Sequence, residues 1–176
     1  MNTLDRRLAP FLRRWDYISF RHLHVFADAF AGYLRLPATP RLAHPLLRRH
    51  GVEIRREPLP PTVHAVWTRD GGDCLIRLSE HLPPGAANFT LWHEWFDLMA
   101  HHPDFPNKPP LRTLERCANR FASCISMPEE AVRRTFEELN GRGDKTTVMA
   151  ARFVVSSSAM RVRLSELNLR WRYDRR

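Results

Sequence analysis

The sequence is poor in features that define several common protein classes. Of its 176 residues only three are cysteine, and Cys74, Cys117 and Cys124 show no clustered spacing. An odd count without such spacing argues against a disulfide framework. Cys117 and Cys124 would lie about 10 Å apart along one helix, which is too far for a bridge. Unpaired cysteines are typical of a reducing compartment, so we expect a cytoplasmic protein.

Glycine and long apolar runs are also scarce. Seven glycines against fourteen prolines predict fixed turns rather than flexible linkers. The first fifteen residues hold no apolar run of the length that a signal peptide or a membrane span needs. No internal repeat and no low-complexity segment is found. A chain of this length that is 43% hydrophobic suits one domain with a small appendage, and we expect no membrane contact.

Positive charge, in contrast, is abundant. There are 28 lysines and arginines, nearly all of them arginine, against 19 acidic residues, so the formal net charge is +9. One interpretation is a soluble protein with an arginine-rich surface. The other is a surface for nucleic acid or an acidic partner. Both stay open, because net charge does not say where the charge lies.

The order of the predicted elements is helices, then strands, then helices, which indicates an α+β domain with a small sheet. We expect a basic helix at residues 4–14, interrupted at Pro10, and a helix at residues 20–36 capped by Ser19. A third helix is expected with Thr39 as its cap, Pro40 at its first position and Gly51 just past its end. Short strands at residues 52–56, 63–69 and 74–78 predict a three-stranded antiparallel sheet, the last two joined as a hairpin. Further helices are expected at residues 111–126 and 128–140.

One helix, over residues 88–102 with the sequence NFTLWHEWFDLMAHH, carries two kinds of side chain on two faces. Positions four apart lie nearly in register, so His93 and Asp97 project side by side and Glu94 lies on the neighbouring strip. The opposite arc is apolar and is expected to be core: Trp92, Trp95, Phe96 and Met99. An amphipathic helix whose polar face happens to carry these groups explains the pattern, and so does a metal site.

A hydrolytic zinc site needs three protein ligands, an open position for water and a carboxylate to take a proton. His93 and Asp97 are the candidate ligands of the central helix, and Glu94 is the candidate general base. The next helix offers Glu115 as the third ligand and, one turn later, Asn119 to hydrogen-bond a ligand. His101 competes with Asp97 only if the helix ends early, since it lies about 12 Å along the axis from His93.

Three segments resemble signatures of the ImmA/IrrE metallo-endopeptidases. They are FTLWHEWFD followed by His101, then ERCANRFASCISMP from residue 115 to 128, then RFVVSSSAMRVRLSEL near the C-terminus. The resemblance covers residues 52–169. It implies a mostly helical, zincin-like zinc endopeptidase in which His93 is the first ligand, Glu94 the catalytic base and Glu115 the third ligand. Its substrates are expected to be helix-turn-helix repressors.

The sequence departs from this family at Asp97, where the family has its second zinc-binding histidine. One histidine and two carboxylates form a harder ligand set, which weakens zinc relative to Mn²⁺ or another divalent ion. The bulky Trp95 and Phe96 also replace residues that are often small in the family. The sequence therefore predicts a metal-dependent endopeptidase that cleaves a regulatory protein, with a degenerate peptidase fold that binds a partner without cutting it as the alternative.

The last segment, residues 146–169, is expected to form two short helices broken near Val155 and capped by Ser156 or Ser157. We divide the chain into N-terminal helices at 1–50, a peptidase core at 51–145 and a helix-turn-helix-like tail at 146–176. The tail is basic: Arg152, Arg161, Arg163, Arg170, Arg172, Arg175 and Arg176. It predicts either a weak DNA contact or, as we prefer, a helical cap on the core, with Val162, Leu164 and Leu167 buried.

Overall fold

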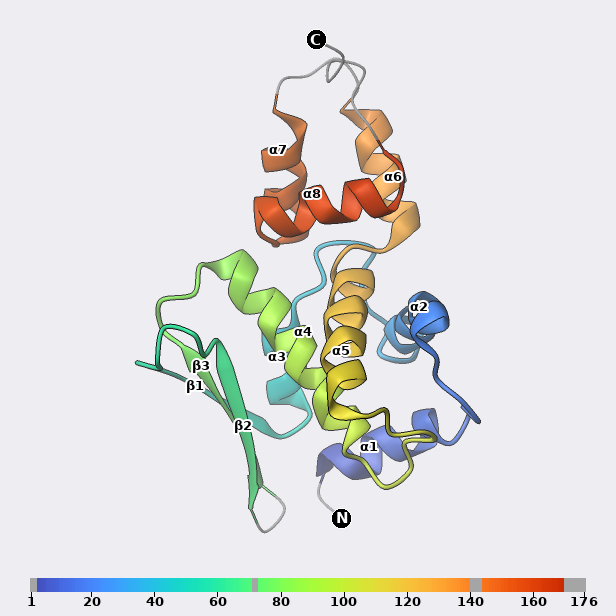
Figure 1. Ribbon diagram of the computed structural model, residues 1–176, viewed down its shortest axis with the longest axis vertical. Coiled ribbons are helices and arrows are strands. Elements are labelled where there is room, and N and C mark those ends of the chain that lie inside the picture. The colour runs from blue at the N-terminus through green and yellow to red at the C-terminus, as the bar shows by residue number, and fades with distance from the viewer. Residues whose placement is uncertain (1–2, 71–72, 140–143, 170–176) are drawn as a thin grey trace.

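The computed structural model describes residues 3–70, 73–139 and 144–169 (Figure 1). In chain order the elements are α1 (Thr3–Leu12), η1 (Phe20–His22), α2 (Leu23–Tyr33), α3 (Ala43–Arg49), β1 (Val52–Glu57), β2 (Ala65–Asp70), β3 (Asp73–Ser79), α4 (Pro84–Ala100), α5 (Leu111–Ser126), α6 (Glu129–Glu138), α7 (Lys145–Phe153) and α8 (Ser157–Glu166). A larger body holds the elements from α1 to α5, and α6 to α8 form a smaller helical lobe. The predicted α+β class is confirmed. No helix in the described ranges is long and apolar enough to cross a lipid bilayer.

The N-terminal helices differ from the prediction at their ends. Helix α1 continues through Pro10, so the predicted interruption is wrong. Pro10 lies in the last turn, and Leu8 and Leu12 on either side of it are fully buried. Packing against the body therefore outweighs the one backbone hydrogen bond that a proline removes. The predicted cap by Ser19 is confirmed, since its hydroxyl accepts the His22 N–H at 3.3 Å.

Helix α3 begins at Ala43, and the predicted start at a Thr39 cap is wrong. The side-chain oxygen of Asn88, on α4, accepts the Ala43 N–H at 2.9 Å and satisfies the helix terminus from 45 residues away. The same amide donates to the Arg41 carbonyl at 3.0 Å. The predicted end is correct: Gly51 follows the helix with a φ of 82°, which glycine adopts without strain.

The sheet is mixed, with the order β1-β3-β2. The predicted hairpin of β2 and β3 is confirmed, with Trp67 opposite Ile76. The prediction of an entirely antiparallel sheet is wrong, because β1 pairs with β3 in parallel, starting at Val52 opposite Cys74. Strand β1 ends opposite Ser79 and β2 begins opposite Leu78, so the proline-rich connector crosses the end of β3 and leaves the central position of the sheet for β3.

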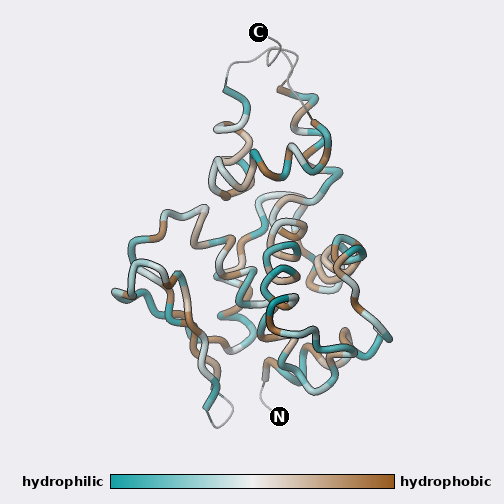
Figure 2. Tube along the Cα trace, viewed as in Figure 1, coloured by the Kyte–Doolittle hydropathy of each residue, from teal (hydrophilic) through white to brown (hydrophobic). Residues whose placement is uncertain are grey.

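Helices α4 and α5 pack side by side at the centre of the body (Figure 1), hydrophobic residues recur along both of them (Figure 2), and they share an aromatic core. The arc predicted to be apolar is buried throughout, with Trp92 and Trp95 fully buried and stacked at 5.3 Å. Phe26 and Phe30 of α2 and Phe121 of α5 complete this core. The polar face of α4 therefore points away from this core. The three cysteines are buried and unpaired, as predicted.

Helices α6 to α8 enclose a second hydrophobic core that includes Met127, Phe153 and Met160. The predicted break between α7 and α8 is confirmed: Val154 has a φ of 52°, and the Ser156 hydroxyl accepts the Ala159 N–H at 3.1 Å. Leu164 and Leu167 are buried as predicted. The prediction for Val162 is wrong, since 59% of its surface is exposed.

Three contacts fix this lobe on the body. The Asn88 amide donates to the Val154 carbonyl at 3.2 Å, and Gly85 lies so close to the Val155 backbone that a Cβ atom there would be 2.5 Å from the Val155 carbonyl carbon. Buried Arg163 also donates to the Met127 carbonyl at 3.0 Å. The lobe therefore has a defined position above one end of α4.

The described part of the tail offers little free positive charge. Arg163 is 2% exposed, and Arg152 pairs with Glu138 at 2.6 Å, whereas Arg161 is exposed. The arginines at 170, 172, 175 and 176 lie outside the described residues. The arrangement of α7 and α8 favours the helical cap.

Candidate functional site

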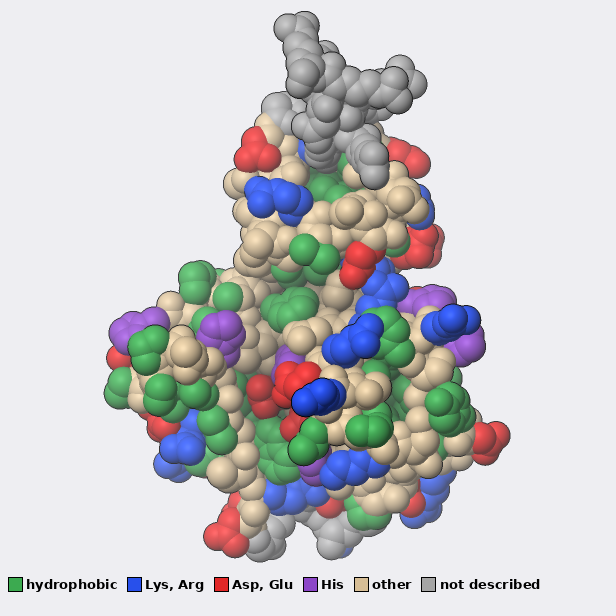
Figure 3. Space-filling view, viewed as in Figure 1, with side chains coloured by type: hydrophobic (Ala, Val, Ile, Leu, Met, Phe, Trp, Pro, Cys, Tyr) green, Lys and Arg blue, Asp and Glu red, His purple; other side chains and the backbone are tan. Residues whose placement is uncertain are grey.

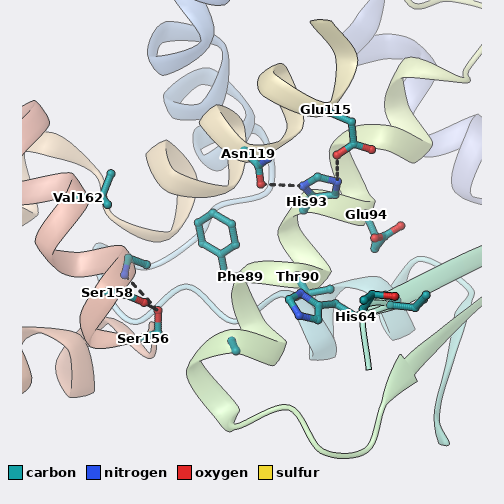
Figure 4. A pocket seen from close by; sticks show the side chains of 15 residues that line it. His64, Phe89, Thr90, His93, Glu94, Glu115, Asn119, Ser156, Ser158 and Val162 are labelled. Carbon is teal, nitrogen blue, oxygen red and sulfur yellow. Dashed lines mark hydrogen bonds and ion pairs between the residues drawn. The ribbon is translucent and has the colours of Figure 1, made fainter. Parts of the chain in front are cut away.

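A cleft of about 820 Å³ lies between the body and the helical lobe. One wall is the polar face of α4 with α5 beside it, a second wall is the start of α8, and a third is the segment that leads into β2 (Figure 4). His93, Glu94, Glu115 and Asn119 line it. Figure 3 shows acidic, basic and hydrophobic side chains gathered together in the hollow between the two parts of the molecule.

His93 lies between two side chains of α5. Its Nδ1 is 3.1 Å from Asn119 Oδ1, and its Nε2 is 3.5 Å from Glu115 Oε2. Because an amide oxygen only accepts hydrogen bonds, Nδ1 donates to Asn119 Oδ1, and this bond turns Nε2 toward the Glu115 carboxylate. Asn119 thus orients the imidazole in the way expected of a group that supports a ligand. The structure brings these three candidate residues together.

Glu94 faces the same cleft from the next position of α4 (Figure 4). Burial and, to a smaller extent, the negative charges of Asp97 and Glu115 together raise the pKa of its carboxyl to about 7. A carboxyl group with a pKa near neutrality exchanges its proton at physiological pH, which is the property of a general acid or base. Glu94 therefore has the electrostatic character that its predicted role requires.

The Asp97 carboxylate is bonded to residues outside this group of side chains. The indole Nε1–H of Trp67, on β2, donates to Asp97 Oδ2 at 2.6 Å. The ring of His101 hydrogen-bonds the Asp97 carbonyl at 2.8 Å, lies 3.6 Å from Oδ1 and packs edge-on against Trp67 at 5.1 Å. Asp97 does not line the cleft. Its carboxylate instead ties α4 to the sheet.

Trp67 is the residue of this region that the sequence did not single out. It belongs to the alternating pattern of a short strand, and nothing local indicates that its indole N–H finds a carboxylate 30 residues later. His101, the alternative ligand, does follow the end of α4 at Ala100. Its ring turns back onto Asp97 rather than toward His93 and Glu115.

The donor set fits a zinc ion only in part. Two ligands of a tetrahedral zinc lie about 3.4 Å apart, because each bond is near 2.1 Å. The separation of 3.5 Å between His93 Nε2 and Glu115 Oε2 matches that value. Across the described residues, however, no three His, Cys, Asp or Glu side chains gather closely enough to hold an ion. With Asp97 bound to Trp67, the residues as folded do not fit a three-ligand zinc site.

Comparisons with known proteins agree with this fold. A transcriptional regulator from Mycobacterium tuberculosis has a similar structure, with a TM-score of 0.59 and 17% sequence identity. The similarity covers 94% of this chain and 52% of the regulator, so the chain spans about half of that protein's length. No curated protein matches the sequence. The family model for the IrrE N-terminal-like domain, Peptidase_M78, matches residues 47–165, and the chain belongs to this family.

Proposed function

We propose that this chain binds an extended segment of a regulatory protein, a helix-turn-helix transcriptional repressor, in the cleft between its body and its helical lobe. The cleft itself carries the proposal, because it is open, about 820 Å³ in volume and lined by the polar face of α4. Sequence membership in a peptidase family supports a peptide as the occupant. The similar fold of a transcriptional regulator supports a role in gene control.

The edge of the sheet favours an extended segment. Strand β2 pairs with β3 on one side only, and residues 62–65, at its start, line the cleft. An edge strand offers unpaired backbone N–H and C=O groups, to which an extended chain adds as a further strand. Backbone pairing of this kind gives affinity for many sequences, and pockets for side chains then give specificity.

The contact between Trp67 and Asp97 favours binding over cleavage by the three-ligand zinc chemistry of the family. A hydrogen bond of 2.6 Å to a carboxylate is a strong, charge-assisted contact. Asp97 would have to give up this bond to serve as a ligand. On this proposal Asp97, at the position where the family has a zinc-binding histidine, holds the wall of the cleft through its hydrogen bond to Trp67.

A metal-dependent endopeptidase is the second candidate, and two observations favour it. His93 and Glu115 have the spacing of a ligand pair, and Glu94 has a pKa of about 7. After release from Trp67, Asp97 would complete the set, and its two carboxylates would suit Mn²⁺ or another divalent ion besides Zn²⁺. On this proposal Glu94 holds and releases the proton of the reaction, and the repressor is cut.

Metal titration separates the two candidates. If Asp97 is a ligand, Asp97→Ala lowers the affinity for Zn²⁺ or Mn²⁺ at least tenfold; if it only ties α4 to the sheet, the affinity is unchanged. Trp67→Phe is the matched control, because it removes the same hydrogen bond and keeps the carboxylate. Calorimetry on the purified chain measures both.

The reading frames next to that of this chain are the place to search for the partner, and a helix-turn-helix repressor encoded there is the protein to test. Binding is followed by fluorescence anisotropy and cleavage by mass spectrometry, with and without added Zn²⁺ or Mn²⁺. Intact repressor bound equally by wild type and Glu94→Gln supports binding without cleavage. Cleavage that chelation and Glu94→Gln abolish supports the peptidase. If the repressor neither binds nor is cleaved in any condition, both proposals are refuted.

A further inference from the structure

A second cavity, of about 370 Å³, continues the cleft along α5 and α8. We infer that it is a specificity pocket, which takes a large apolar side chain of the bound protein segment and places a neighbouring carboxylate of that segment on Arg116. This inference rests on the proposed function, since it says which segments the cleft selects.

The two cavities form one continuous surface. They share four lining residues: Phe89, Asn119, Ala159 and Val162. Figure 4 shows Val162 on α8 facing Phe89 and Asn119 across the opening, with His93 beyond them. A segment that lies along α4 past His93 therefore reaches this pocket with adjacent residues and without leaving the protein surface.

The walls of the pocket are apolar and unfilled. Val162 is 59% exposed and Phe20 is 40% exposed, while Met127 closes the floor and is buried. Most large apolar residues of the chain are buried in one of the two cores. Apolar side chains that line a concavity and stay exposed are typical of a surface that another apolar group covers.

The charge at the pocket rim selects for an acidic neighbour. Arg120 and Arg163 both bind Glu166, at 2.6 and 3.0 Å, so these charges are already paired. Arg116 lies over the Phe20 ring at 5.1 Å and has no carboxylate partner within the part of the chain that the structure describes. Its guanidinium thus stays open to a carboxylate while it flanks the apolar pocket.

A displayed library of random linear peptides tests the inference on the full chain. Selection on wild type is expected to enrich peptides with a large apolar residue and an Asp or Glu within two positions of it. On Arg116→Glu the acidic preference is expected to become a preference for Lys or Arg, and on Val162→Asp the apolar preference is expected to disappear. Both positions are exposed, so both variants should fold.

Arg112→Glu is the matched control, because Arg112 is an exposed arginine one turn earlier on α5 and lines neither cavity. It should select the same peptides as wild type. For the enriched peptide, exchanging the acid for lysine is expected to weaken binding to wild type at least fivefold and to strengthen binding to Arg116→Glu.

If all four proteins enrich the same peptides, the specificity pocket is refuted and peptide binding in the cleft stands. If wild type enriches no peptide, both the pocket and the proposed function are refuted.

Discussion

Replacing Glu94 with glutamine is expected to stabilise the protein above neutral pH and to remove part of its dependence on pH. The pKa of this carboxyl is about 7 in the folded protein and near 4.5 when the chain is unfolded. The folded state therefore binds more protons between these values, so the contribution of Glu94 to stability is fully present below pH 4.5. It is lost as the pH rises from about 4.5 to about 7.

The size of this effect follows from the two pKa values. A pKa difference of this size corresponds to about 3 kcal/mol, and screening by water in the open cleft lowers the expected loss to about 2–3 kcal/mol. Glutamine has the same shape and no charge to desolvate. As the pH rises from 5 to 8, the free energy of unfolding of Glu94→Gln should therefore increase by that amount relative to wild type. For a chain of this length this corresponds to roughly 5–10 °C in Tm.

Urea unfolding at pH 5, 6, 7 and 8 in the presence of a chelator measures the difference directly. The chelator is needed because a cation bound near His93 and Glu115 would itself favour ionised Glu94. Glu137→Gln provides the control, since Glu137 is exposed on α6. If Glu94→Gln keeps the wild-type pH profile, the electrostatic account of the cleft is wrong.

Three further substitutions test how the lobe is fixed on the body. Gly85→Ala places a Cβ 2.5 Å from the Val155 carbonyl carbon and should cost about 1–3 kcal/mol in urea unfolding, whereas Gly32→Ala, with open space around it, should not. Asn88→Ala removes three hydrogen bonds to backbone groups and should cost about 2–4 kcal/mol by the same assay. Arg163→Met leaves the Met127 carbonyl without its buried donor and should cost about 1–3 kcal/mol, while Arg161→Met on the same helix should be nearly neutral.

The sequence was most informative where contacts are local. The two faces of α4 follow from the period of the helix, and Trp92 and Trp95 lie in the core for that reason. The cap of α8 by Ser156 is equally local, since the hydroxyl bonds an N–H three residues ahead. The proximity of Glu115 to His93 was also anticipated, because α5 is the next helix in the chain and offers a carboxylate as a third ligand.

The errors concern contacts between residues far apart in the chain. Helix α3 starts at Ala43 because the Asn88 side chain, 45 residues later, satisfies its first N–H. The parallel pairing of β1 depends on where the proline-rich connector carries the chain, which hydrophobic alternation does not encode. Val162 was expected in the core because it is apolar, and periodicity alone does not distinguish a core from an apolar cleft wall.

The same limit applies to Asp97, the most informative residue of the site. Its position one helical turn after His93 suggested a metal ligand. Only the fold brings the Trp67 indole to its carboxylate. This hydrogen bond holds β2 against α4, and the start of β2 is one wall of the cleft. Asp97 therefore supports, through Trp67, the wall on which an extended segment is proposed to lie. The proposed binding of such a segment therefore does not depend on Asp97 as a metal ligand, and metal titration of Asp97→Ala together with the repressor binding assay tests this separation.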